Sequence, residues 1–511
     1  MSQISNKRVA KNTVMLYFRM IFMMMISLYT SRVILNTLGV EDYGIYNVVG
    51  GIITMFAFIN WAMSSATQRY ITFALGNESQ EHLQKVFSTA LQIHIILACV
   101  IALLGETIGL WFLYEKMQIP EERLDAAFWV LQFSIITSII NIVSVPYNAD
   151  IVAHEKMDTF AYISIIEAIL KLIIVYTLVV FNFDKLILYA FLLMMVQVLI
   201  RFCYSTYCHY HFRETIYVNI FEKKLFKEMM GFAGWSMIGN LAAVLFSQGL
   251  NMLLNVFFGP VVNAARAIAV QVQSTIQQFV SNFQMAINPQ ITKNYAQGNL
   301  HDMHKLIFCS ARFSFYLLFL LSLPILLETK YILTIWLKNV PDNTVVFLRL
   351  MICTSLLYTL SNPLMIANQA TGKIKKYQSV CGTILLLILP VSYLFLHFGF
   401  PAYVVFIVHF LMEIIAQLAR MILLRPLIGI KIRDYVQNIY KNIISVILVS
   451  LVLPFFVYVN MEENFIRLIL TIITSLTMTA LTIYKIGLSR NERAIIKTKV
   501  LEKIKYNEKD N

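Results

Sequence analysis

The chain has 511 residues, of which 59% are hydrophobic and only 14% are charged. Soluble domains are close to half apolar and a quarter charged, so this composition excludes an ordinary soluble protein and indicates a membrane protein. The formal net charge is +13, from 41 Lys and Arg residues against 28 Asp and Glu residues.

Apolar runs of membrane-spanning length recur along the whole chain and leave no room for a large soluble domain. A bilayer core of about 30 Å needs about 20 apolar residues per helix. The period-2 alternation of a membrane β-barrel is absent. We therefore predict an all-α polytopic membrane protein with about fourteen transmembrane helices. The predicted ranges are 14–36, 44–66, 86–113, 125–148, 160–182, 186–209, 232–258, 261–288, 306–328, 344–366, 378–397, 402–424, 441–459 and 464–487.

The basic residues predict the orientation of the chain in the membrane. The run over 14–36 is too long for a removable signal peptide and contains Arg19 and Arg32. With the N-terminus in the cytoplasm, most Lys and Arg residues fall in cytoplasmic segments, as the positive-inside rule requires. Both termini are therefore predicted to be cytoplasmic, and the distribution of the positive charge predicts membrane lipids as partners but no nucleic acid. The basic clusters behind this prediction lie at 223–227, 373–376, 431–433 and 490–509.

An internal repeat predicts the domain organisation. ITFALGN at 71–77 is echoed by ITKNYAQGN at 291–299, and FSTA at 87–90 by FCSA at 308–311. The shared offset of about 220 residues contains six predicted helices, so the two copies enter the membrane in the same orientation. We expect one six-helix lobe over 1–215 and a second over 216–430. Two additional helices and a basic cytoplasmic tail occupy 431–511.

One predicted helix, VVNAARAIAVQVQSTIQQFVSNFQMAINP, combines membrane length with many amides and a single charge, Arg266. Its polar residues recur at steps of 3 or 4 and so share one helical face, which must contact protein or a wet cavity. We expect a substrate-binding cavity, although amides that only join helices, at about 0.6 kcal/mol per contact, are the alternative. The predicted cavity residues are Arg19, Lys171, Asn240, Asn251, Asn255, Asn263, Arg266, Ser274, Gln277, Gln278 and Ser281.

The intramembrane cations divide into two kinds. Arg19 and Arg266 have no acidic partner in their own helices, so we expect them to bind an anion, and the planar guanidinium suits phosphate. Lys171 lies four residues after Glu167, and an internal ion pair is the alternative to a cavity role. Arg420 lies near a helix end, and we expect its head to reach the interface.

No catalytic or metal-binding motif accompanies these residues. Walker, H-E-x-x-H, G-x-S-x-G and C-x-x-C patterns are absent. The six cysteines lack paired spacing, which argues against a disulfide framework or a zinc site. We predict that the protein is not an enzyme and holds neither a metal nor a cofactor. Glu106, Glu167 and Glu413 within the predicted helices, and Asp150 at a helix end, are candidates for ion coupling but stand in no diagnostic motif.

The segment LGVEDYGIYNVVGGIITMFAFINWAMSSATQRYITFALG (38–76) resembles the polysaccharide transporter family, which comprises O-antigen-type flippases. This family belongs to the multidrug/oligosaccharidyl-lipid/polysaccharide exporter superfamily. GVEDYGIYN and ATQRY are the most distinctive parts, and GPVVNAARAIAVQVQS fits the same family in the second half. The resemblance covers essentially residues 1–487.

The resemblance implies a MATE-like flippase of the bacterial inner membrane that moves a polyprenyl-diphosphate-linked oligosaccharide to the periplasmic leaflet for surface polysaccharide (O-antigen, capsule or lipopolysaccharide) synthesis. It implies alternating access around a cationic cavity, in which Arg19 and Arg266 match the arginines of the first and eighth helices. It also implies coupling to a proton or sodium gradient, and contacts with polysaccharide assembly proteins are an open expectation.

Three other functions remain open from the sequence. A MATE-type antiporter of cationic small molecules would favour acidic cavity groups, against which Arg266 argues. A membrane-embedded polysaccharide polymerase or glycosyltransferase would need a large external loop or a D-x-D-type carboxylate pair, and neither is present. A scaffold for an assembly complex would not need the repeat or the polar face.

Overall fold

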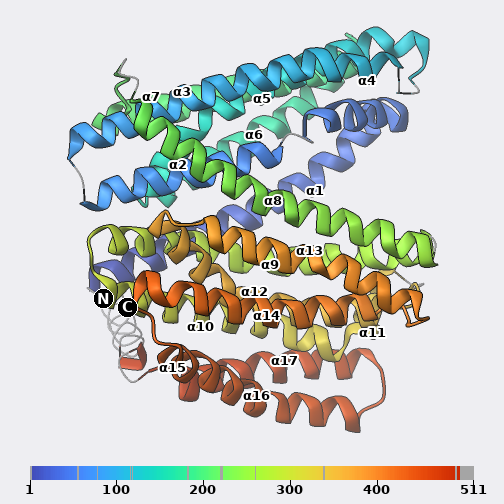
Figure 1. Ribbon diagram of the computed structural model, residues 1–511. Coiled ribbons are helices and arrows are strands. Elements are labelled where there is room, and N and C mark those ends of the chain that lie inside the picture. The colour runs from blue at the N-terminus through green and yellow to red at the C-terminus, as the bar shows by residue number, and fades with distance from the viewer. Residues whose placement is uncertain are drawn as a thin grey trace, which may run out of the picture. The chain divides into compact units, whose positions relative to one another are not determined.

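A computed structural model describes residues 3–54, 57–77, 79–115, 117, 119–180, 183–218, 222–258, 260–337, 340–489 and 492–494. Within these ranges every regular element is helical (Figure 1). This confirms the all-α class that the composition predicts. Most of the predicted basic tail, residues 495–511, lies outside the described residues.

Eleven helical segments of the described chain are long and apolar enough to cross a bilayer. They correspond to eleven of the predicted helices, with ends that differ by several residues. The predicted spans 14–36, 44–66 and 261–288 have no counterpart among the eleven, although the described parts of all three are helical. The amides of 261–288 explain its absence, since they lower the mean hydropathy of a helix that is otherwise long enough. The protein is a multi-pass membrane protein, and the number fourteen stays a prediction.

The first helix differs from the prediction. Helix α1 runs from Gln3 to Thr54 without the break that the sequence predicts between residues 36 and 44. At a rise of 1.5 Å per residue, 52 residues exceed the thickness of a bilayer. The glycines of GVEDYGIYN weaken a helix by only about 1 kcal/mol each, which is too little to end it in this setting.

The chain divides into two compact units. The first comprises Met1–Leu241, Met285–Met303 and Gln369–Ser379. In it α5 packs against α2, α3 and α7, and α1 packs against α6 (Figure 1). The elements that lie wholly in this unit are α1, α2 (Ala57–Asn77), α3 (Gln80–Leu104), η1 (Gly105–Gly109), α4 (Leu110–Glu115), η2 (Glu121–Arg123), α5 (Leu124–Ala153), α6 (Met157–Val180), α7 (Lys185–His211) and η3 (Arg213–Thr215).

Local sequence signals begin these helices, and apolar packing holds them together. Ser79 is the N-cap of α3, and its side chain accepts a hydrogen bond from the backbone N–H of His82 at 3.3 Å. Asp184 caps α7 in the same way. The core of the first unit includes Phe87, which packs edge-on against Tyr147 with ring centroids 5.2 Å apart.

The second unit comprises Ala242–Gln284, His304–Asn368 and Val380–Asn511. Five helices contribute residues to both units: α8 (Lys223–Phe258), α9 (Pro260–Ala296), α10 (Leu300–Leu327), α12 (Thr344–Thr371) and α13 (Lys375–His397). The elements that lie wholly in the second unit are α11 (Thr329–Leu337), α14 (Val404–Ile428), α15 (Ile432–Tyr435), η4 (Val436–Tyr440), α16 (Lys441–Asn460), α17 (Phe465–Thr482) and η5 (Ile483–Gly487).

The polarity of the helices α16 and α17 is typical of a membrane protein. These helices pack against each other (Figure 1). Thr471, Ser475 and Thr479 recur every four residues in α17 and are all buried. Leu448 and Val452 of α16 are largely exposed. Small polar residues inside and large apolar residues outside suit helices that pack closely within lipid. The repeat-based lobes 1–215 and 216–430, with the addition 431–511, stay a prediction.

Candidate functional site

Arg266, the single charge of the polar stretch in α9, is held by neutral groups. The side chain is buried, with 8% of its surface exposed. One terminal nitrogen donates a short hydrogen bond to Asn251 Oδ1 of α8. The other lies 3.2 Å from the backbone oxygen and 3.4 Å from Oγ of Ser247. The Nε atom is buried without a hydrogen-bond partner. The guanidinium is thus oriented by dipoles and keeps an uncompensated charge among the described residues.

The other polar residues of the predicted face on α9 differ in their hydrogen bonding. Some bond to the backbone of their own helix, and others have buried oxygens without a partner. Ser274 and Ser281 are exposed and donate to backbone oxygens of the preceding turn, at 3.0 and 3.1 Å. Gln278 is also exposed. Asn263 Oδ1 and Gln277 Oε1 are buried without hydrogen-bond partners. Because a buried amide oxygen without a partner is costly, these two atoms are suited to accept from a ligand hydroxyl or from water.

Other amides of α9 join helices, as the alternative interpretation predicts. Gln273 donates to Ser355 Oγ of α12 at 2.6 Å. Gln284 donates to Ser314 Oγ of α10 at 3.1 Å. One helix therefore carries both uses of the amide: bonds to neighbouring helices and free oxygens.

In the first unit, Arg19 and Lys171 have different surroundings. The Arg19 guanidinium lies over the ring of Phe160, 4.6 Å from its centroid, and its Nε atom is buried without a hydrogen-bond partner. Lys171 donates to Glu167 at 2.6 Å, the i,i+4 ion pair that the spacing predicts as the alternative to a cavity role. Gln197 also donates to Glu167, at 3.0 Å.

The predicted cavity residues fall into both units. Arg19, Lys171 and Asn240 belong to the first, and those from Asn251 to Ser281 belong to the second. Asn240 is half-buried. The side chain of Asn255 lies outside the described part of the structure. A single cavity that includes all of these residues stays a prediction.

Arg420 corrects an expectation, because it does not reach the interface. It is buried in α14 and forms an ion pair with Glu413 of the same helix at 2.6 Å. Its guanidinium also donates to Ser361 Oγ of α12 at 2.7 Å, and Gln417 contacts the same hydroxyl at 2.8 Å. A carboxylate two turns away on the same face removes the reason for the arginine to leave the protein interior.

A cavity of about 840 Å³ in the first unit was missed by the sequence reasoning. It lies where the end of α2, the start of α8 and the α12–α13 connection meet. Five Lys and Arg residues line it against two carboxylates, and aromatic rings complete the wall. The lining includes Arg69, His82, Lys224, Lys227, Lys373 and Lys375, the acids Glu222 and Glu228, and the rings of Tyr70, Phe73, Phe232 and Trp235.

Arg69, from the ATQRY stretch of α2, connects several parts of the cavity wall. Its guanidinium donates to the backbone oxygens of Gln369 and Ala370, at 3.1 and 2.9 Å, at the C-terminal end of α12. It also lies over the rings of Tyr70 and Phe73, at 4.6 and 4.8 Å from their centroids. The lysines at 224–227 and 373–375, which the sequence explains as signals of orientation, thereby line one anion-attracting cavity.

Comparisons with known proteins show which family the chain belongs to. No curated protein sequence matches the chain. Three solved structures illustrate its similarity in fold. An outward-facing multidrug resistance MATE family transporter of the MOP superfamily is 14% identical over 83% of this chain and 96% of its own, with a TM-score of 0.69. The Vibrio cholerae MATE transporter VcmN in the bent form is 17% identical over 86% and 100%, with a TM-score of 0.65.

The third is a MOP superfamily transporter from Pyrococcus furiosus, for which a binding pocket of reverse polarity is taken to indicate a different function. It is 14% identical over 82% of this chain and 96% of its own, with a TM-score of 0.67. At these identities the likeness establishes the fold alone, which is that of the MATE transporters. A profile of the polysaccharide biosynthesis protein family matches residues 9–295, more than half of the chain. With the fold of a membrane transporter and this match, the chain belongs to the polysaccharide biosynthesis protein family.

Proposed function

We propose that this transporter is a flippase for a polyprenyl-diphosphate-linked oligosaccharide. In this proposal it works in the bacterial inner membrane with both termini in the cytoplasm, and it moves an O-antigen- or capsule-type repeat unit by alternating access. A proton or sodium gradient drives the cycle, and polysaccharide assembly proteins receive the product.

The observation that carries the proposal is the environment of Arg266. A buried guanidinium held by Asn251 and Ser247, with no carboxylate of the described residues bound to it, favours an anionic partner. A diphosphate supplies oxygens that accept paired N–H donors. The neighbouring buried oxygens of Asn263 and Gln277 suit the hydroxyls of a sugar.

The basic cavity around Arg69 supports the same substrate class. Its lysines lie in segments that the charge distribution predicts to be cytoplasmic, which is the side where a lipid-linked oligosaccharide is assembled. We expect this cavity to attract the diphosphate first. Aromatic rings such as Trp235 offer flat faces to sugar rings in the same wall.

The test is complementation of a strain that lacks the chromosomal copy. Arg266→Ala is expected to abolish surface glycan and to leave lipid-linked oligosaccharide in the cytoplasmic leaflet, because the diphosphate loses its buried cation. Arg266→Lys is expected to retain part of the activity, because charge remains without the planar fork. Arg433→Ala, an exposed arginine of α15, is the matched control and is expected to behave as wild type.

Surface glycan, leaflet-specific lipid-linked oligosaccharide and membrane-inserted protein are measured together, so that loss of protein is separated from loss of transport. Full surface glycan from an Arg19→Ala/Arg266→Ala double variant at normal protein level would contradict the proposal. Resistance to cationic drugs conferred by the wild type, with no glycan defect in the deletion strain, would favour a MATE-type antiporter instead.

A further inference from the structure

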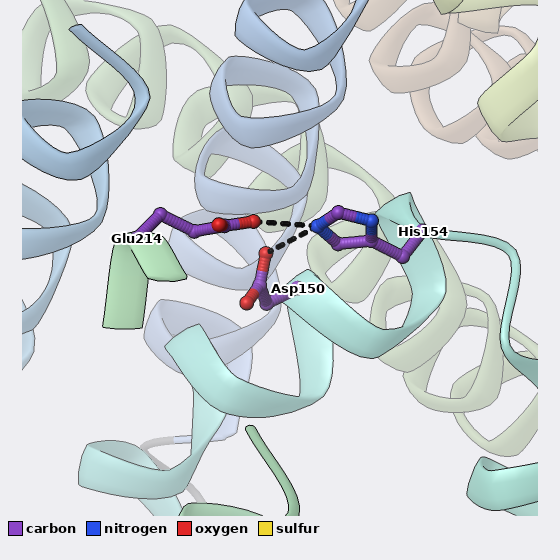
Figure 2. Close-up of side chains that lie close together, drawn as sticks. All are labelled: Asp150, His154 and Glu214. Atoms are coloured by element: carbon purple, nitrogen blue, oxygen red, sulfur yellow. Dashed lines mark hydrogen bonds and ion pairs between the residues drawn. The ribbon is translucent and has the colours of Figure 1, made fainter. Parts of the chain in front are cut away.

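Three side chains of the first unit converge at the end of α5, and the proposed transport assigns no role to any of them. Figure 2 shows Asp150 and His154 of α5 turned toward Glu214 of η3. One ligand atom from each residue lies within 4.8 Å of the others. His154 Nε2 is 2.5 Å from Glu214 Oε1 and 3.7 Å from Asp150 Oδ1.

Asp150 is the unusual member of this cluster. Its side chain is 0% exposed, and neither carboxylate oxygen has a hydrogen-bond partner. Its ion-pair contact within the described chain is the 3.7 Å approach to His154. A buried carboxylate without hydrogen bonds is strongly disfavoured unless a cation or a proton compensates it. One of the two oxygens, Oδ1, is directed toward the His154 ring (Figure 2).

The surroundings hold the other two ligands in place. Glu214 is buried, and its second oxygen accepts from Gln80 Nε2 at 2.8 Å. The His154 ring stacks on Phe212 at 4.0 Å between centroids, with an interplanar angle of 6°. Outer groups that orient ligands in this way are a feature of protein metal sites. The His154 side chain remains 25% exposed, so one of the three ligands is in contact with solvent.

Although the sequence motifs predict no metal, we propose that Asp150, His154 and Glu214 form a binding site for a divalent transition metal, with Zn²⁺ as the best-suited ion. One imidazole nitrogen and two carboxylates match the ligands of Zn²⁺, and water supplies a fourth position. Bonds of about 2.0–2.2 Å in a tetrahedral site separate ligand atoms by about 3.4 Å. Shifts of about 1 Å bring the three ligand atoms to that separation, and the ion replaces the proton between His154 and Glu214.

The consequence of binding is local. The ion fixes η3, which begins the connection from α7 to α8, to the C-terminal end of α5. The site therefore holds this connection in place, and its test needs no lipid-linked substrate.

The test uses the purified full-length chain in detergent micelles after treatment with a chelator. Zn²⁺ is titrated in competition with a chromophoric chelator, Co²⁺ is added for its visible spectrum, and Mg²⁺ is the comparison ion. We expect one Zn²⁺ per chain, a Co²⁺ spectrum of low coordination number, and no competition from Mg²⁺. Amide hydrogen exchange in residues 212–218 is expected to slow with Zn²⁺.

Variants test the ligands individually. Asp150→Asn and Glu214→Gln are expected to weaken Zn²⁺ binding at least about 100-fold, and Gln80→Ala about 10- to 100-fold. His209→Gln, an exposed histidine at the end of α7, is the matched control and is expected to bind as wild type. Asp150→Asn keeps the shape of the side chain and removes its charge, so it keeps the test valid if Glu214→Gln does not fold.

An absence of stoichiometric Zn²⁺ in the wild type overturns the site. If Asp150→Asn then melts at the same or a higher temperature, Asp150 is a protonated acid instead of a metal ligand. Equal binding of Zn²⁺ by wild type and Asp150→Asn also overturns it. So does slower amide hydrogen exchange in residues 212–218 with Mg²⁺ but not with Zn²⁺.

Discussion

Two buried arginines of the second unit show opposite ways of placing a cation within a membrane protein. Arg420 of α14 has a carboxylate, Glu413, at 2.6 Å and a hydroxyl from α12. Arg266 of α9 has an amide oxygen, a hydroxyl and a backbone oxygen, and one buried nitrogen is left over. Arg420 and Arg266 are buried to a similar extent.

The difference lies in what each arginine leaves for a ligand. An ion pair with further hydrogen bonds compensates Arg420 within the protein, so its role is to join α12 and α14. Dipoles orient Arg266 without cancelling its charge, so an anion still gains from approaching it. The number of buried charges therefore says less about function than the charge of their partners.

The largest expected effect comes from removing the compensated cation. Arg420→Ala leaves the buried carboxylate of Glu413 alone and is expected to lower the free energy of unfolding by about 3–5 kcal/mol. Thermal or SDS-induced unfolding of the purified protein measures it. The double variant Glu413→Gln/Arg420→Met is expected to regain most of the loss. A loss below about 1 kcal/mol for Arg420→Ala would mean that Arg420 does not compensate the buried charge of Glu413.

A smaller effect on stability is expected at the uncompensated cation. Arg266→Ala leaves only neutral acceptors, among them Asn251, so the expected loss is about 1–3 kcal/mol. The same unfolding measurement, set beside the transport assay, checks this prediction. If Arg266→Ala unfolds the protein as severely as Arg420→Ala, the contrast between the two sites is wrong.

The smallest effect is expected at a partly exposed cation, Arg123, which bridges Asp42 at 2.6 Å and Asp184 at 2.5 Å. Exposed pairs are worth about 0.2–1 kcal/mol, so Arg123→Gln is expected to cost about that much. Partial burial raises the pKa of Asp184, but hydrogen bonds from Arg123 and the start of α7 outweigh it and hold the pKa below its ordinary value.

A group with a depressed pKa stabilises the folded state at neutral pH and loses that contribution as the pH falls through its folded-state pKa. The wild type is therefore expected to lose more stability than Arg123→Gln between neutral and strongly acidic pH, in melting curves recorded at low salt. Parallel losses for the two proteins would show that the bridge adds nothing.

The periodicity of the sequence predicts most of the helices, because membrane length and apolar runs are local properties. It fails at α1, where GVEDYGIYN predicts a break and the chain stays helical. The expectation that Arg420 reaches the interface is also wrong. Glu413 lies seven residues earlier on the same face, and this spacing could have predicted the ion pair. The sequence predicts Arg19 and Arg266 as anion-binding residues because neither has an acidic partner in its own helix.

Properties that depend on distant segments could not be predicted. The basic cavity forms where lysines from residues 224–227 and 373–375 come close together, and no local sequence pattern predicts this proximity. Asp150 was noted at a helix end, but its proximity to Glu214 arises from how α5 and η3 pack. Tertiary packing, rather than propensity, decides both.

The clamp of Arg69 on the end of α12 bears on how relatives of this chain are recognised. ATQRY is among the most distinctive stretches of the family resemblance, and its arginine holds the last carbonyls of a helix, where the backbone then turns at Gly372 with φ of +72°. A resemblance carried by ATQRY therefore reflects how α12 ends in this fold, as well as which residues line the basic cavity.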